Sequence, residues 1–234
     1  MFNYGYLTSK PVATGGTISY KNGLKIHTFT GSGNFVVTGG TLNVKVFVLA
    51  GGGAGAFDNM FPGGGGAGGD AIYNTNYSAT GTITVTVGGG GSNSVFGTLT
   101  SYAGGYPTGI WCGWLGGRNT LYTGGTCGIA EPDWGWSGSG AGAGGSVNET
   151  GNGGIGYTTN VDGDNQTLGG GGAGGSWQWM WSGAWYPYST VDGGGAYGHP
   201  SGSNGTIYTG GGGGGGLDAA GSGGSGIVIV SYPI

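Results

Sequence analysis

Charged side chains are rare in this chain. Its 234 residues include five lysines and arginines, nine aspartates and glutamates and two histidines. General acid–base catalysis needs titratable groups placed around a substrate, and so small a set offers few ways to place them. We therefore expect a protein that is not an enzyme and has no catalytic residues.

Positive charge is confined to one end of the sequence. Beyond residue 45 the one basic residue is Arg118, because the lysines are Lys10, Lys21, Lys25 and Lys45. A nucleic-acid-binding surface requires a basic stripe that neutralises phosphates, so we expect no nucleic-acid partner. No run of apolar residues approaches the roughly 18 residues of a membrane-spanning helix, so we expect no membrane insertion.

Motifs for metals and nucleotides are incomplete. Residues 140–145 have the glycine spacing of the dinucleotide fingerprint, but no strand-to-helix pattern surrounds them. Residues 162–165 (DGDN) resemble the start of a calcium loop but lack its twelfth-position glutamate, which favours a polar turn. Neither His27 nor His199 has a cysteine or histidine at metal-binding spacing. We expect no cofactor and no metal.

Cysteine is scarcer still. Cys112 and Cys127 enclose a short glycine-rich loop, and both a disulfide and two small buried thiols fit this spacing. A disulfide would form only after the protein left a reducing cytoplasm. The N-terminus lacks the basic head and apolar stretch of a secretory signal, so we expect synthesis in a cytoplasm and release by cell lysis.

Glycine, in contrast, accounts for 68 of the 234 residues, while there are only 7 prolines. This much glycine is typical of low-complexity or disordered chains. Disordered chains are poor in aromatic residues, however, and this one has 8 tryptophans, 14 tyrosines and 7 phenylalanines. Collagen is excluded because proline is rare and the glycine runs do not keep a strict period of three.

The first hundred residues have the pattern of β-strands. Residues 82–87 (TITVTV) place Ile83, Val85 and Val87 on one face and threonines on the other, as in a strand with one solvated face. Residues rich in β-branched and aromatic side chains predict further strands at 24–30, 34–37 and 42–50, with weaker candidates at 70–77 and 94–101.

The C-terminal residues 226–234 read as a strand buried on both faces, and we expect it to return to the same sheet. Because no segment has helical periodicity, the fold class is all-β. We predict an antiparallel β-sandwich base formed by residues 16–101 and 226–234 and closed by the C-terminal strand. Residues 1–15 are expected to be an N-terminal tether or docking segment.

Residues 102–225 are the glycine-rich remainder. Chains in the polyproline-II conformation make no internal hydrogen bonds, so their backbone groups point sideways and need neighbours. Without Cβ atoms, glycine segments can approach closely enough to satisfy one another. We therefore expect a polyglycine-II-like helical bundle with long aromatic loops. The alternative is a flexible linker.

All eight tryptophans lie in two segments, 105–136 and 176–188. Tryptophan and tyrosine often dominate binding hot spots, and loops on a rigid scaffold are the usual place for recognition. The alternative is that Trp177, Trp179 and Trp181 alternate along a strand and cover an apolar sheet. The predicted receptor- or partner-binding residues are Tyr106, Trp111, Trp114, Trp134, Trp136, Trp177, Trp179, Trp181, Trp185, Tyr186 and Tyr188.

Several phrases together resemble the glycine-rich domain of bacteriophage tail-fibre and other virion proteins. They are ATGGTISY at 13–20, LKIHTFTGSGNF at 24–35, VKVFVLAGGG at 44–53, GGGGAGG at 63–69, TVTVGGGGSNSVFG at 84–97 and GSGIVIV at 224–230. The resemblance covers roughly residues 13–101 and 205–232. In architecture alone, the chain also resembles the distal-tip adhesins of T-even-type phage fibres, whose polyglycine-II layers carry receptor-reading loops.

The resemblance implies the fold and a virion setting but assigns no binding residues. We predict a tail-fibre tip adhesin that contacts a host surface glycan or outer-membrane protein through its aromatic loops. Residues 1–15 would bind other virion proteins. The alternative is a structural virion protein, a capsid-decorating or fibre-forming subunit whose aromatic loops pack on neighbouring copies in a homo-oligomer. An ice- or surface-binding protein is a third interpretation, disfavoured because ice binders present flat, regular faces of small residues.

Overall fold

The described part of the chain is built from β-strands and extended glycine segments. The computed structural model describes residues 10–57, 63–110, 113–115, 120, 128–129, 135–136, 138–146, 151–175, 190 and 192–234. All regular structure in these ranges is β, in antiparallel pairs, which confirms the all-β prediction. None of the described residues forms a helix of the length and apolar character needed to cross a membrane.

One large sheet and three hairpins contain all the described strands. The sheet comprises β1 (Val12–Thr14), β2 (Thr17–Lys21), β3 (Leu24–Phe29), β4 (Gly33–Leu49), β5 (Ala71–Thr86), β6 (Ser94–Phe96), β7 (Leu99–Ser101) and β14 (Ile227–Pro233). The hairpins pair β8 (Thr108–Ile110) with β9 (Gly113–Leu115), β10 (Gly128–Ile129) with β11 (Gly135–Trp136), and β12 (Tyr157–Thr159) with β13 (Gln166–Leu168).

The C-terminal strand occupies the middle of the large sheet. Its strand order is β2-β3-β14-β4-β5-β6-β7, with β1 paired to β4. Strand β14 pairs antiparallel with both β3 and β4, and all but its last residue are buried. The prediction that residues 226–234 return to the sheet is therefore confirmed. Strand β1 also lies within the predicted tether 1–15, so the sheet begins before residue 16. The docking role of that segment stays a prediction.

Strand β4 is longer than the sequence pattern predicts. Residues 34–37 and 42–50 were expected to form two strands, but β4 runs from Gly33 to Leu49 and pairs with β5 on both sides of a register shift at Val37 and Thr41. Gly39 and Gly40 lie in this shift with φ of 80° and 136°, a backbone region that glycine adopts readily. The strand therefore bends at this point without ending.

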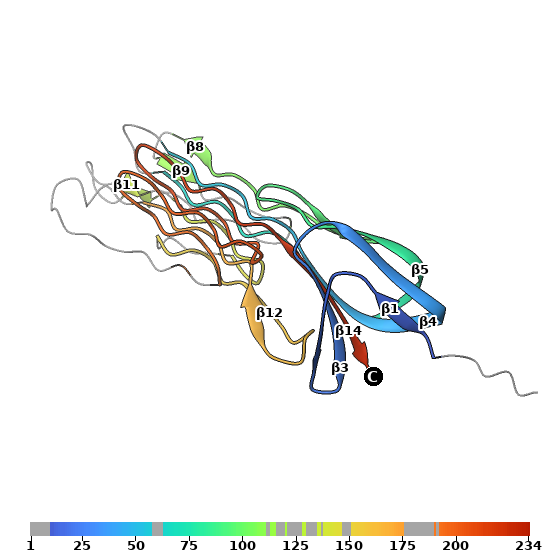
Figure 1. Cartoon of the computed structure of the whole chain (residues 1–234). Helices are drawn as coiled ribbons and strands as arrows, with labels where there is room; N and C mark the ends of the chain where they lie inside the picture. Colours follow the sequence, from blue (N-terminus) through green and yellow to red (C-terminus); the bar gives the residue numbers. More distant parts are fainter. Residues whose placement is uncertain are drawn as a thin grey trace, which may run out of the picture.

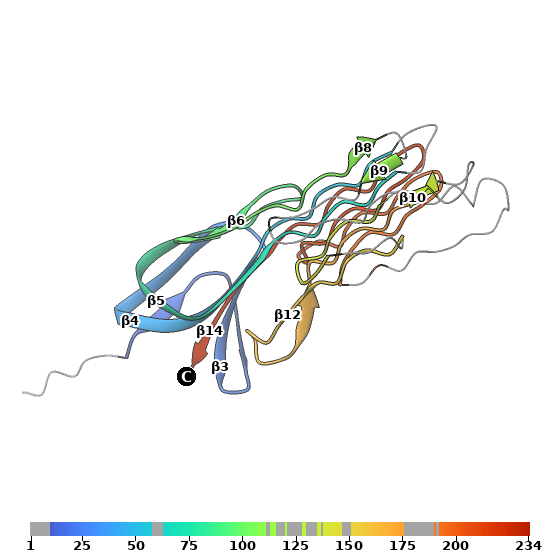
Figure 2. The same cartoon turned by 180° about the vertical axis from the view of Figure 1, so that it is seen from behind.

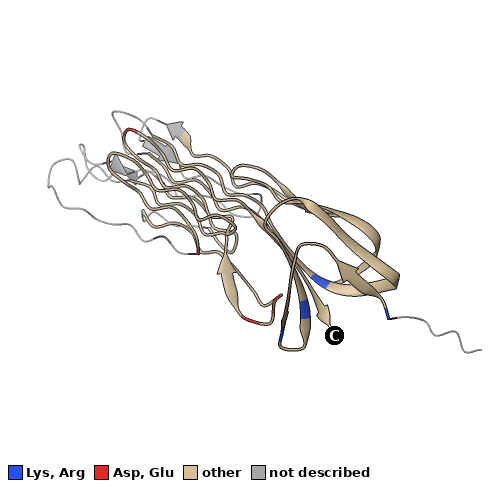
Figure 3. Ribbon diagram, viewed as in Figure 1, with Lys and Arg blue, Asp and Glu red and all other residues tan. Residues whose placement is uncertain are grey.

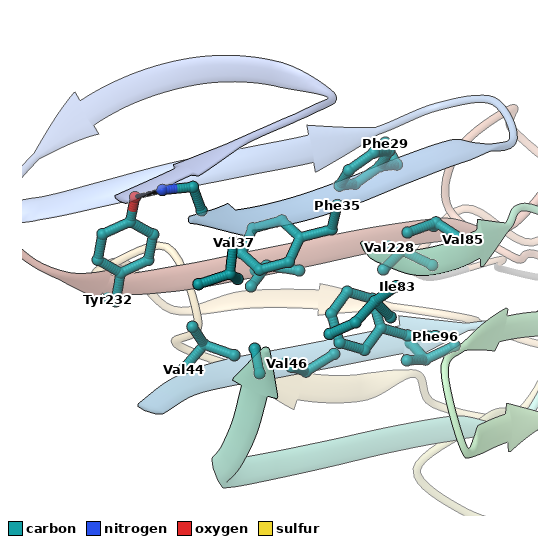
Figure 4. Close-up of a cluster of buried hydrophobic side chains, with 14 residues drawn as sticks. Phe29, Phe35, Val37, Val44, Val46, Ile83, Val85, Phe96, Val228 and Tyr232 are labelled. Carbon is teal, nitrogen blue, oxygen red and sulfur yellow. Dashed lines mark hydrogen bonds between the residues drawn. The ribbon is translucent and has the colours of Figure 1, made fainter. Parts of the chain in front are cut away.

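The bend brings both halves of β4 into one hydrophobic core. Phe35 from the first half and Val46 from the second are fully buried in the same cluster, together with Phe96 of β6 (Figure 4). Tyr232 of β14 closes the cluster, and its hydroxyl oxygen accepts a hydrogen bond of 3.3 Å from the Ala13 amide of β1. As predicted, Ile83 and Val85 of β5 face this core, while the alternating Thr82, Thr84 and Thr86 are exposed.

A second cluster lies on the opposite side of the sheet, beneath the β12–β13 hairpin. Fully buried Val161, from the turn of this hairpin, packs with Ile26 of β3 and Phe47 of β4. The Lys21 ammonium group makes an ion pair with Asp164 in the same turn. Residues 162–165 thus form a polar turn, as predicted, and this turn docks on the sheet.

The glycine segments extend from the sheet as a bundle of extended chains, the glycine array (Figure 1). We define it as residues 50–57, 63–70, 88–93, 102–107, 138–146, 151–156, 169–175 and 192–226. Strands β14, β4 and β5 continue into it, and their order is kept. Gly52 N donates to Gly224 O at 3.0 Å, and Gly53 N donates to Ala67 O at 2.8 Å. The sheet therefore sets the starting register of the array.

Hydrogen bonds within the array recur every third residue. One set of amides in segment 63–70 donates to segment 210–216, through Gly63 N to Gly216 O (3.0 Å), Gly66 N to Gly213 O (2.8 Å) and Gly69 N to Gly210 O (2.9 Å). The next set donates to a different neighbour, through Gly65 N to Gly138 O (3.0 Å) and Gly68 N to Ala141 O (2.8 Å). The expected lateral bonding is present, which argues against a flexible linker.

At most of their glycine positions, the inner segments leave no room for a side chain. A Cβ atom on Gly213 would lie 2.0 Å from the carbonyl oxygen of Gly221, and one on Gly215 would lie 2.1 Å from that of Gly63. These neighbours are backbone atoms held by their own hydrogen bonds, so they cannot rotate away. Segments 63–70, 169–175 and 210–216 are buried throughout. Backbone therefore takes the place of a side-chain core.

Replacing one inner glycine by alanine tests this packing. We expect Gly213→Ala to lower the free energy of unfolding by about 3 kcal/mol, the upper end for overpacking in a rigid core. The matched control is Gly89→Ala, because a Cβ at exposed Gly89 meets no atom within 4 Å. Chemical denaturation of both variants measures the difference, and equal stabilities would contradict close packing of the array.

Candidate recognition surface

The array separates two ends of the molecule. The large sheet, with the end of β14, lies at one end, and hairpins β8–β9 and β10–β11 lie at the other (Figures 1 and 2). The segments between the two ends are joined laterally by backbone hydrogen bonds. These two hairpins therefore lie at the end of the array away from the sheet.

Two of the predicted tryptophans belong to these hairpins. Trp114 lies in β9 and Trp136 lies in β11, and the two strands are neighbours although they come from different hairpins. The structure thus brings together two parts of the first tryptophan-rich segment. Other predicted residues lie outside the described part of the chain: Trp111, Trp134, Trp177, Trp179, Trp181, Trp185, Tyr186 and Tyr188, and the two cysteines Cys112 and Cys127.

Tyr106 is the predicted residue whose side chain the structure describes. Its side chain is 63% exposed, on the segment that leads into β8. Gly91 lies beneath it, since a Cβ there would be 2.8 Å from the Tyr106 hydroxyl oxygen. Tyr102 on the same segment is 51% exposed and was not predicted. Tyr102 stands alone between Ser101 and Ala103, and a single tyrosine in such a context carries no sequence signal that separates exposed from buried positions.

A buried carboxylate anchors the first tryptophan-rich segment at the sheet end of the array. Asp70, which is 4% exposed, accepts hydrogen bonds from the Thr120 amide (3.1 Å, to Oδ1) and the Thr120 hydroxyl (to Oδ2). Burial raises the pKa of Asp70, and the two bonds from Thr120 act in the opposite direction. Sequence reasoning missed this residue because it marks only the end of a glycine run before β5.

The described charged residues are unevenly distributed over the molecule. All four lysines lie on or beside the large sheet, whereas the described acids lie in the array and in the β12–β13 hairpin (Figure 3). The described strands at the far end, β8 to β11, contain no charged residue. Among residues that the structure describes, no group of three potential metal ligands occurs. In the sequence, Arg118 lies between β9 and β10, and Glu131 and Asp133 lie between β10 and β11, outside the described residues.

The comparison with protein families identifies the class of the chain. The profile of a glycine-rich domain matches residues 28–233, which is most of the chain. The protein therefore belongs to this glycine-rich domain family, which confirms the domain that the sequence phrases predicted, while the bacteriophage setting stays a prediction. No curated protein matches the chain.

The Asp70 carboxylate makes the stability of the protein depend on pH. Because its pKa is raised in the folded state, the contribution of Asp70 is fully present below the unfolded pKa of about 3.8 and is lost as pH rises through the folded pKa. We expect the stability of the wild type relative to Asp70→Asn to fall over this interval and to be constant on either side. Denaturation of both proteins across this pH range provides the measurement. A relative stability that rises with pH would show that the hydrogen bonds from Thr120, and not burial, decide the direction in which the pKa of Asp70 is shifted.

Proposed function

We propose that the protein is a receptor-binding protein of a bacteriophage particle, a tail-fibre tip adhesin that contacts the host surface through its aromatic loops. In this proposal the large sheet is a β-sandwich base on the virion side. The glycine array is a polyglycine-II-like bundle that holds the aromatic loops at a fixed distance from it. The protein would act in the virion, after synthesis in the host cytoplasm and release by lysis.

The hydrogen-bond period supports a polyglycine-II-like array. A chain with three residues per turn turns the same side to the same neighbour at every third residue. Segment 63–70 has this pattern toward segment 210–216, and segment 210–216 repeats it toward segment 169–175 with Gly212 N to Gly170 O and Gly215 N to Ala173 O, each at 2.9 Å. Such a bundle is stiff because each chain is tied to several others.

The observation that carries the proposal is the position of the hairpins. Strands β9 and β11, which bear Trp114 and Trp136, lie next to each other at the end of the array opposite the lysine-bearing sheet. Aromatic side chains held by a rigid scaffold bind partners with little loss of conformational entropy. In a molecule with two such different ends, one end can serve for attachment and the other for recognition.

The aromatic residues of the far end suit a ligand with apolar faces. Strands β8 to β11 carry no charged residue, and the segment 105–136 to which they belong holds three: Arg118, Glu131 and Asp133. Indole and phenol rings bring large apolar faces with a polar tip, which fits the apolar faces and hydroxyl groups of a surface glycan or an aromatic-rich patch on an outer-membrane protein. Binding that relies on such contacts should depend weakly on salt.

A structural virion protein is the second candidate. The same aromatic residues would suit packing on neighbouring copies, because interfaces between subunits are enriched in aromatic side chains. The two candidates differ in what the aromatic loops touch: the host, or another copy.

Exchange of the aromatic segments separates these candidates. We expect particles in which residues 106–136 and 176–188 are replaced by Gly/Ser linkers to assemble normally but to lose adsorption to the host by at least about tenfold, the effect of one lost hot-spot residue. The measurements are counts of intact particles by electron microscopy and of unadsorbed particles after mixing with host cells.

The control changes exposed apolar residues at the opposite end of the array. Ile207 and Tyr208 are 63% and 41% exposed in the turn before Gly210, which lies against Leu49 at the sheet. The double variant Ile207→Ser, Tyr208→Gly should adsorb like the wild type. Failure of the segment-exchanged particles to assemble would favour the structural candidate. Normal adsorption by those particles would contradict the adhesin proposal.

A further inference from the structure

Strand β2 is an open edge of the large sheet. It lies at the end of the strand order, and all five of its residues are exposed. Its pairing with β3 is regular from Thr17 to Lys21, with no bulge, and it contains no proline. The opposite edge is formed by β7, which has three residues, none of them exposed. A regular, exposed edge is a template for pairing with another strand.

The turn that follows β2 determines which backbone groups face outward. Asn22 and Gly23 form a two-residue loop with φ of 50° and 74°, as in a type I′ hairpin. In such a hairpin Lys21 and Leu24 form a hydrogen-bonded pair, and bonded pairs alternate along the ladder. The amides and carbonyls of Ile18 and Tyr20 therefore point away from β3. No other described backbone group bonds to them.

We infer that β2 pairs with β2 of a second copy of this chain, about a two-fold axis at Ser19. In this antiparallel register, Ile18 lies opposite Tyr20 of the second copy, and Tyr20 lies opposite its Ile18. These two pairs use the four outward-facing amides and the four outward-facing carbonyls to make four hydrogen bonds. The strand is thus complementary to itself, as an interface between identical subunits requires.

The side chains of β2 fit the same arrangement. Ile18 and Tyr20 are 40% and 65% exposed on one face of the strand, and an aromatic residue opposite a β-branched one is a favourable cross-strand pair. Lys21 would lie opposite Thr17 of the second copy, so like charges do not meet.

The local charges favour a second copy over an acidic partner. The ammonium group of Lys21 is already paired with Asp164, and that of Lys25, on the adjacent strand, donates to the Ala13 carbonyl at 2.7 Å. An acidic peptide at this edge would find both lysines engaged. This inference does not rest on the proposed function, since it concerns the sheet end of the molecule only.

A disulfide at the two-fold axis tests the register. In a background with Cys112→Ser and Cys127→Ser, we expect oxidised Ser19→Cys to form a covalent dimer, because non-hydrogen-bonded partners have Cα atoms about 4.5 Å apart, within disulfide range. Thr17→Cys is the control on the same face of the strand. Its counterpart in the second copy would be four residues along, about 13 Å away, so it should remain monomeric.

Two proline variants test the dimer without a cross-link. Ile18→Pro removes an outward amide and leaves the β2–β3 bonds intact, so we expect a folded monomer in sedimentation velocity, whereas the wild type sediments as a dimer. Ser19→Pro removes an inward amide and should lower the melting temperature. The inference is overturned if the purified wild type is monomeric at all concentrations, or if Ser19→Cys cross-links no faster than Thr17→Cys.

Discussion

Contact between backbones, possible only where Cβ atoms are missing, governs this structure. In most domains side chains fill the space between elements, and here the elements approach until one segment's amide meets the next segment's carbonyl. Gly213 shows the constraint, with room for a hydrogen atom but not for a methyl group. The constraint does not hold at every position of the array, because Ala67, Ala141 and Ala173 are fully buried there and do carry a methyl group. The geometry of the array therefore decides which positions must be glycine. This requirement explains a glycine content that would otherwise suggest disorder.

A bundle of this kind has few side chains to fix its register, and the large sheet supplies that register. Strands β4, β5 and β14 enter the array with their order preserved. Two further contacts hold the parts together: the β12–β13 hairpin, whose Val161 is buried against the sheet, and Asp70, which holds Thr120. The lysines lie at the sheet, and the hairpins β8–β9 and β10–β11, which include Trp114 and Trp136, lie at the other end of the array. In the proposed function, the sheet end is the attachment end and the hairpin end is the recognition end.

The sequence predicted the parts of the fold that depend on local pattern. Alternation of Ile83 and Val85 with threonine predicted the last part of β5, and the apolar run before Pro233 predicted β14. The sequence pattern divided β5 into candidates at 70–77 and 82–87, whereas the structure has one strand, Ala71–Thr86. The sequence pattern did not predict that β4 continues through Gly39 and Gly40, because this depends on pairing with β5. It also did not predict that Val161, in an otherwise polar turn, is buried in the second cluster, because its partners there are distant in sequence. For the candidate site, composition located the tryptophan-rich segments. The neighbouring positions of Trp114 and Trp136 follow from the packing of two hairpins, which no periodicity encodes.

Hydrogen exchange at the glycine amides tests the central claim most directly. If the array is held by backbone hydrogen bonds, amides of segments 63–69, 169–175 and 210–216 will exchange as slowly as those of β14 in the sheet. Exposed Gly89, whose amide is in no described backbone bond, will exchange much faster. Exchange of all glycine segments at the rate of an unfolded peptide would contradict the account, because a floppy array cannot hold the aromatic hairpins in place.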